Sequence, residues 1–222
     1  MMLTHGVSSA SAHLVRFGIR TKLANYGYSL QTELLPADRS IICVSTHACS
    51  LDAWIAFDLT YRALRRRFMQ LGDTTILSRF PMLHRFGSLP VSAADPMLTM
   101  RSLSAAGKAL RTNRNVALWL FPTGHHVPSG SGIGTIRPGL QALGRFAGDS
   151  VIVPVGFHYY AYHRPRLAVW VHIGSPIGTA REIACASWQT VARDTSEALA
   201  RTAQEAVTQV RRHVDEQYAD PR

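Results

Sequence analysis

The sequence predicts an α/β fold in which a mostly parallel central sheet is flanked by helices on both faces. Short apolar, β-rich runs alternate with longer amphipathic segments, and this alternation is typical of parallel sheets. Polar turns follow several of the apolar runs, as expected where strands end at one edge of such a sheet. No repeat, low-complexity tract or linker interrupts the 222 residues, so we expect a single domain over residues 1–222.

The predicted strands are runs of apolar and β-branched residues. They cover residues 41–44, 74–77, 88–92, 116–121, 151–155 and 167–173. The predicted helices cover residues 10–27, 51–66, 96–112, 138–146 and 188–216. Pro96 suits the first turn of its helix, because the N–H that proline lacks has no partner there in any case. Pro154 indicates that its strand lies at a sheet edge or ends there, because proline cannot donate to a ladder.

The first predicted helix, residues 10–27, is both amphipathic and basic. Its apolar residues recur at helical spacing, and cations stand between them. The apolar residues are Leu14, Val15, Ile19, Leu23 and Tyr26, and the cations are Arg16, Arg20 and Lys22. Such a helix can lie in a membrane interface, with its apolar side in the lipid and its cations on the headgroups. The alternative is a helix that packs on the domain and keeps its charges in water.

The chain is strongly basic, with 24 Lys and Arg against 14 Asp and Glu and a formal net charge of +10. This balance favours an anionic partner such as phospholipid headgroups, nucleic acid or a nucleotide cofactor. We expect no nucleic-acid partner, because basic and aromatic residues do not interleave and no recognition element is present. No apolar run approaches the roughly 18 residues of a spanning helix, so we expect any membrane contact to be peripheral.

The cysteines and histidines indicate a reducing compartment and argue against a metal site. Cys43, Cys49 and Cys185 have no paired or Cys-x-x-Cys spacing, which argues against a disulfide framework and for a reducing compartment. Polar residues break every apolar run near the N-terminus, so no signal peptide is predicted, and we expect a cytoplasmic protein that is peripheral on the membrane. The 10 histidines lack the spacing of a metal site, so no metal is expected.

His47 and Asp52 stand in the string THACSLD, between a predicted strand and the helix that follows it. An imidazole can act as a base near neutral pH, and a carboxylate on its far nitrogen fixes the tautomer and stabilises the cation. On one continuous helix the two side chains would lie on different faces, whereas a turn at His47 can fold it back onto Asp52. We therefore predict that His47 is a catalytic base and that Asp52 orients it.

A second polar turn follows the predicted strand 116–121. Its residues are Phe121, Pro122, Thr123, Gly124, His125 and His126. A Pro-x-Gly turn can expose backbone N–H groups that hold an anion. Arg137 and Gly139 follow at the start of the predicted helix 138–146, where an arginine is a suitable phosphate ligand. We predict that these eight residues bind substrate.

In this order and at these distances, the elements resemble the motifs of the phospholipid/glycerol acyltransferase family, which includes the lysophosphatidate acyltransferases. The resemblance covers about residues 35–216. The matches are His47 and Asp52 for His-x4-Asp, residues 80–92 for the second motif, residues 121–126 for Phe-Pro-Glu-Gly-Thr-Arg, Arg137 with Gly139 for a lysine/arginine-x-Gly element, Pro154 with Val155 for Pro-Val, and residues 174–177 for Gly-x-Pro-Ile.

The resemblance implies a glycerolipid acyltransferase-like fold and transfer of an acyl group to a hydroxyl. The donor would be acyl-CoA or acyl-carrier protein, as a co-substrate and with no further cofactor. His47 would deprotonate the acceptor hydroxyl, which then attacks the thioester directly, and Asp52 would orient His47. Enzymes of this family work at the membrane, so a membrane lipid surface is an expected partner.

Three positions depart from the family pattern. Ser92, Thr123 and His126 stand where the family has Arg, Glu and Arg, which help to bind a glycerol-phosphate acceptor. Because a phosphate site depends on such charge-assisted hydrogen bonds, a neutral acceptor such as a sugar, a glycolipid or another lipid hydroxyl is favoured. The alternative function is a catalytically weak or inactive lipid-binding member of the same fold, against which the intact His47 and Asp52 argue.

Overall fold

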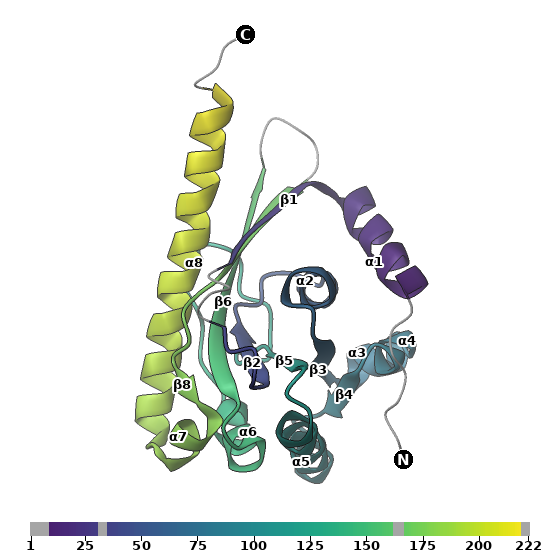
Figure 1. Cartoon of the computed structure of the whole chain (residues 1–222), viewed down its shortest axis with the longest axis vertical. Helices are drawn as coiled ribbons and strands as arrows, with labels where there is room; N and C mark the ends of the chain where they lie inside the picture. Colours follow the sequence, from purple (N-terminus) through teal and green to yellow (C-terminus); the bar gives the residue numbers. More distant parts are fainter. Residues whose placement is uncertain (1–8, 31–34, 162–166, 219–222) are drawn as a thin grey trace.

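The computed structural model describes residues 9–30, 35–161 and 167–218, and an eight-stranded sheet forms its centre (Figure 1). The strands follow the order β1-β7-β6-β2-β5-β3-β4, and β8 pairs with β6 off this path. The pairings are parallel except where β6 meets β7 and β8, which confirms the predicted mostly parallel α/β sheet. The bounds are β1 Leu23–Leu30, β2 Ile41–Ser45, β3 Arg67–Asp73, β4 Ser88–Val91, β5 Val116–Leu120, β6 Val151–Ala161, β7 Leu167–Ile173 and β8 Gly178–Thr179.

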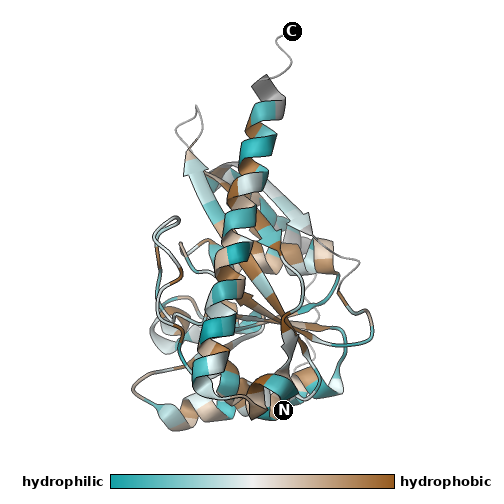
Figure 2. Ribbon diagram, turned by 90° about the vertical axis from the view of Figure 1, so that its left-hand side faces the viewer, coloured by the Kyte–Doolittle hydropathy of each residue, from teal (hydrophilic) through white to brown (hydrophobic). Residues whose placement is uncertain are grey.

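Helices cover both faces of the sheet, and α8 runs along one of them (Figure 2). One face carries α1 (Ser9–Lys22) and α2 (Asp52–Leu59), which continues into a π-helical segment (Thr60–Leu64). The other face carries α5 (Pro96–Thr112), α6 (Gly139–Ala147), α7 (Ala180–Cys185) and α8 (Trp188–Tyr218). Two short helices, α3 (Thr74–Arg79) and α4 (Met82–Arg85), connect β3 to β4. None of the described helices is long and apolar enough to cross a lipid bilayer.

The buried strands explain the two-sided core. All five residues of β2 are buried, because side chains alternate between two covered faces. Ile41 and Cys43 pack in the cluster that contains α1 and α2, whereas Ile42 and Val44 pack in the cluster of α5, α6 and α8. The sheet is therefore packed between two apolar layers, and the turns at its edge leave from buried strands.

The first segment is not one helix over residues 10–27, because the chain becomes strand β1 at Leu23. Parallel pairing with β7 overrides the helical spacing, and Gly27 leaves room for the Trp170 ring, which a Cβ there would meet at 2.3 Å. Val15 and Ile19 are buried in the core, so this apolar stripe packs on the domain, as in the alternative given above. The side chain of Leu14 lies outside the described residues.

The predicted strand at 74–77 is wrong, because these residues begin helix α3. The Asp73 side chain accepts a hydrogen bond from the Thr75 N–H and so caps this helix. Thr75 and Ile76 are both exposed between the half-buried Thr74 and the buried Leu77, and this three-residue spacing is helical rather than the alternation of a strand. The strand itself lies just before, as β3, and it starts at Arg67, directly after the last residue of the predicted helix 51–66.

Pro154 does not mark a sheet edge or a strand end. It lies within β6, an interior strand that continues to Ala161. On one side, the partner of β6 changes from β8 at Ile152 to β7 at Val155. Pro154 lies between these two pairings, and its carbonyl accepts a hydrogen bond from the Gly174 N–H. The N–H that proline lacks would therefore lie where neither β8 nor β7 is paired with β6.

Gly156 sets the closeness of α8 to β6, and its replacement provides a test of this packing. A Cβ at this position would come within 2.6 Å of the Thr202 carbonyl oxygen and within 2.7 Å of Ala203 backbone atoms. We expect Gly156→Ala to lower the free energy of unfolding by about 1–3 kcal/mol, measured by urea denaturation. Gly18→Ala is the control, because a Cβ there meets nothing within 4 Å. Equal stability of the two variants would contradict the packing.

Candidate active site

The two polar turns predicted from the sequence meet at one edge of the sheet. β2 and β5 are parallel neighbours with Val44 opposite Leu120, so the turns that leave them start side by side. The Val127 N–H donates to the His47 carbonyl at 2.7 Å and ties the second turn to the first. His47 and residues 121–127 therefore share the carboxyl edge of the strands, where parallel sheets place their ligands.

The imidazole of His47 and the carboxylate of Asp52 are hydrogen-bonded, as predicted. The distance from His47 Nδ1 to Asp52 Oδ2 is 2.9 Å, and the same oxygen accepts from the backbone N–H groups of Ala48 at 2.7 Å and Cys49 at 3.0 Å. Asp52 is fully buried at the first residue of α2, and His47 is 19% exposed. Because the carboxylate accepts, Nδ1 carries the proton and the neutral ring offers Nε2 as an acceptor.

Tyr159 completes the surroundings of the carboxylate, and sequence reasoning missed it. Its hydroxyl donates to Asp52 Oδ1 at 2.5 Å. Burial and the neighbouring Asp52 carboxylate raise the pKa of Tyr159 far above its ordinary value, so the hydroxyl remains a donor. The residue lies in the part of β6 beyond Val155, where the sequence predicted no strand, and no motif marks it.

Two aromatic rings from the second turn hold the ring of His47. Phe121 stacks on it with 4.3 Å between the centroids, and His126 lies tilted against it at 4.2 Å. Burial lowers the pKa of His126, and so does the nearby His47, which favours an uncharged ring at position 126. Phe121 and His126 therefore lie at the candidate base, whereas their predicted role in binding substrate stays a prediction.

The rest of the turn is occupied with its own hydrogen bonds. The buried Thr123 hydroxyl donates to the His125 carbonyl at 2.8 Å, and His125 Nδ1 donates to the Thr123 carbonyl at 2.9 Å. Gly124 has a φ of +66° and donates its N–H to the Phe121 carbonyl. Pro122 is buried, and its carbonyl accepts from the Arg137 N–H. Of the adjacent histidines, only His126 reaches His47.

Arg137 lies beside this turn, and no described contact joins Arg137 or Gly139 to His47. The Arg137 guanidinium is exposed and passes over Gly124, where a Cβ would approach it to 3.1 Å. Gly139 opens α6, and a Cβ there would meet nothing within 4 Å. The predicted cation therefore lies exposed beside the second turn, and its role as an anion ligand stays a prediction.

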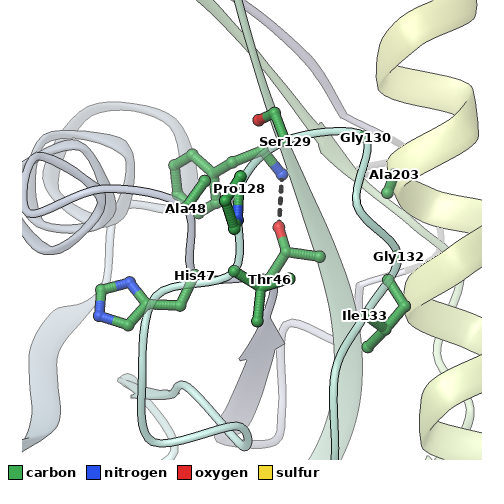
Figure 3. A pocket seen from close by; sticks show the side chains of 11 residues that line it. Thr46, His47, Ala48, Pro128, Ser129, Gly130, Gly132, Ile133 and Ala203 are labelled. Carbon is green, nitrogen blue, oxygen red and sulfur yellow. Dashed lines mark hydrogen bonds between the residues drawn. The ribbon is translucent and has the colours of Figure 1, made fainter.

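A small cavity lies next to the backbone of residues 46–48. It measures about 30 Å³, which leaves room for water but not for an acyl chain. In Figure 3 the imidazole of His47 points away from the Gly130, Gly132 and Ala203 side of this cavity. Among the described residues, no group of three or more His, Cys, Asp or Glu side chains is placed to hold a metal ion.

Removing the Tyr159 hydroxyl tests its bond to Asp52. We expect Tyr159→Phe to lower the free energy of unfolding by about 1.5–3 kcal/mol, because a buried carboxylate loses a hydrogen bond. Urea denaturation measures the change. Tyr160→Phe is the matched control, because the next residue of the same strand has no hydrogen bond to Asp52. The same loss in both variants would argue against a specific bond at Tyr159.

Comparison with known proteins places the fold. No family model and no curated protein matches the chain. Its structure is similar to the crystal structure of the 1-acyl-sn-glycerophosphate (LPA) acyltransferase PlsC from Thermotoga maritima, with a TM-score of 0.62 and 16% sequence identity. The match covers 88% of this chain and 79% of that chain. The chain therefore has the α/β fold of this glycerophosphate acyltransferase.

Proposed function

We propose that the protein is an O-acyltransferase that moves a fatty acyl group from acyl-CoA or acyl-carrier protein to a lipid or glycolipid hydroxyl. One observation carries the proposal: a buried carboxylate, Asp52, holds the Nδ1–H of His47 at the carboxyl edge of an acyltransferase-like fold. The free Nε2 of His47 is the atom that a general base needs. The partly exposed ring leaves this atom a route to a substrate.

The proposed reaction is a direct transfer. His47 Nε2 takes the proton of the acceptor hydroxyl, and the oxygen forms a bond to the thioester carbonyl carbon. The carbon–sulfur bond then breaks, and the leaving thiolate receives the proton from His47. Asp52 keeps the imidazole in the required tautomer and stabilises its cation while the proton is on it.

The surroundings of His47 support an uncharged acceptor. The Ser92 hydroxyl accepts from the Ala94 N–H within its own loop, and the Ser92 N–H and carbonyl both meet the hydroxyl of Thr99 in α5. Thr123 is bonded within its turn, and burial favours an uncharged His126. None of these three side chains is the guanidinium or ammonium that holds a phosphate through charge-assisted hydrogen bonds, whereas the imidazole of His126 can hydrogen-bond to a sugar hydroxyl. We propose His126 as a ligand of the acceptor and Arg137 as a ligand of the anionic donor.

Thiol release tests the activity. With a panel of acyl-CoA and acyl-carrier protein donors, we expect release that depends on an acceptor and falls by about 10²–10⁴-fold in His47→Ala, because the base is lost. Ser50→Ala is the matched control, since this exposed residue lies between His47 and Asp52 and is expected to retain full activity. If folded wild-type protein binds lipid but releases no thiol from any donor, the alternative of an inactive lipid-binding protein is supported instead.

The acceptor proposal is tested with a single cation placed at the site. We expect His126→Arg to raise the rate with lysophosphatidate relative to that with neutral lipid acceptors, because a guanidinium can bind a phosphate through two hydrogen bonds. His125→Arg adds the same charge on a side chain that does not reach His47, so its ratio of rates should stay close to wild type. Competing acceptors and product masses give the ratio. Wild-type protein that acylates lysophosphatidate as readily as any neutral lipid would overturn the proposal.

A further inference from the structure

Exposed apolar side chains are concentrated on the helices that contact the edge strand β4, namely α3, α4 and α5. Of the nine large apolar side chains that are exposed in the described part of the chain, five lie between residues 76 and 100. They are Ile76, Phe80, Met82, Met97 and Met100. They come from α3, α4, the residues that join these helices, and the first turns of α5. We call the surface of α3, α4 and the first two turns of α5 the α3–α5 rim.

The position of this rim relates it to the candidate base. α3 starts directly after the carboxyl end of β3, and α5 starts shortly after the carboxyl end of β4. Because β2, β5, β3 and β4 are parallel neighbours, both helices start at the edge where His47 lies. Figure 1 shows α3 and α4 next to each other beyond the β4 end of the sheet.

The charge of the rim is positive. No Asp or Glu occurs between Asp73 and Asp95, and none occurs in residues 96–148. The two bordering carboxylates cap helices, since Asp73 accepts from the Thr75 N–H and Asp95 from the Leu98 N–H. The cations Arg79, Arg85 and Arg101 are exposed on the same elements, and the Arg79 guanidinium lies over the Phe80 ring at 5.6 Å.

We propose that the α3–α5 rim docks on an anionic lipid bilayer. Apolar side chains next to exposed arginines suit the membrane interface, where the former enter the acyl boundary and the latter meet the headgroups. The long run without Asp or Glu favours a surface that is negative over its whole area, as an anionic bilayer is, and an acidic protein is the occupant that the experiment below must exclude. Docking in this way turns the edge that bears His47 toward the lipid. This binding does not depend on the proposed acyl transfer.

Vesicle sedimentation of the full chain tests the proposal. The probes are vesicles of phosphatidylcholine alone and of phosphatidylcholine mixed equally with phosphatidylglycerol. We expect binding to the mixed vesicles, weakened about tenfold or more in Phe80→Ser/Met82→Ser by loss of apolar contact. Arg79→Gln/Arg85→Gln should lower it roughly fivefold for each cation, and added salt should remove most of this difference.

Controls separate the rim from other surfaces. Arg201→Gln/Arg211→Gln removes the same charge from exposed positions of α8 and should bind vesicles nearly as wild type does. Met97→Ser/Met100→Ser probes the rim independently of α3 and α4 and should also weaken binding. Circular dichroism establishes that each variant is folded.

Three results would overturn the proposal. Wild-type protein that binds neither kind of vesicle is one, including the case in which it binds only an acidic carrier protein. A second is binding at the wild-type level by both apolar rim variants, Phe80→Ser/Met82→Ser and Met97→Ser/Met100→Ser. A third is a loss of binding confined to Phe17→Ser, which would place the contact on α1. Since no thioester is present, a failure of the acyltransferase proposal leaves these outcomes unchanged.

Discussion

The buried carboxylate of Asp52 is the constraint on which the arrangement of the candidate site depends. A carboxylate removed from water is costly unless donors fill its oxygens. Here the donors come from the His47 ring, from two backbone N–H groups of the turn after β2, and from Tyr159 on β6. The conformation in which the turn gives its two N–H groups to the carboxylate also presents His47 Nδ1 to it. The need to satisfy a buried charge and the orientation of the candidate base are therefore one requirement.

The sheet supplies the remaining constraints on the imidazole. β5 ends next to β2, so Phe121 and His126 reach the ring from the turn that follows β5. Thr46 joins the same region to β6, because its hydroxyl accepts from the Phe157 N–H at 2.9 Å. A ring held on several sides loses little freedom when a substrate arrives, which favours a well-defined position for proton transfer. The second turn contributes this positioning mainly through stacking rather than through charge.

Sequence patterns predicted the sheet class, most elements and the contact between His47 and Asp52, because each of these follows from local composition or from a strand-to-helix turn. The errors arose where distant contacts decide. β1 forms because β7 lies beside it and Trp170 covers Gly27, and Pro154 is tolerated inside the sheet because the partner strand changes there. Tyr159 could not be predicted, since it lies 107 positions from the carboxylate that it contacts.

The close contact of α8 with Gly156 links the packing of the C-terminal helix to the strand that carries Tyr159. Gly156 faces the backbone of Thr202 and Ala203, and three residues further along β6 Tyr159 faces Asp52 on the other side of the sheet. One strand is thus held between the C-terminal helix and the buried charge. A survey of every substitution in the chain would then find positions of α8 whose sensitivity resembles that of site residues, although no α8 side chain is hydrogen-bonded to His47 or Asp52 among the bonds described. Substitutions at these positions would be poorly tolerated because α8 packs directly on β6, and not because the residues take part in the chemistry.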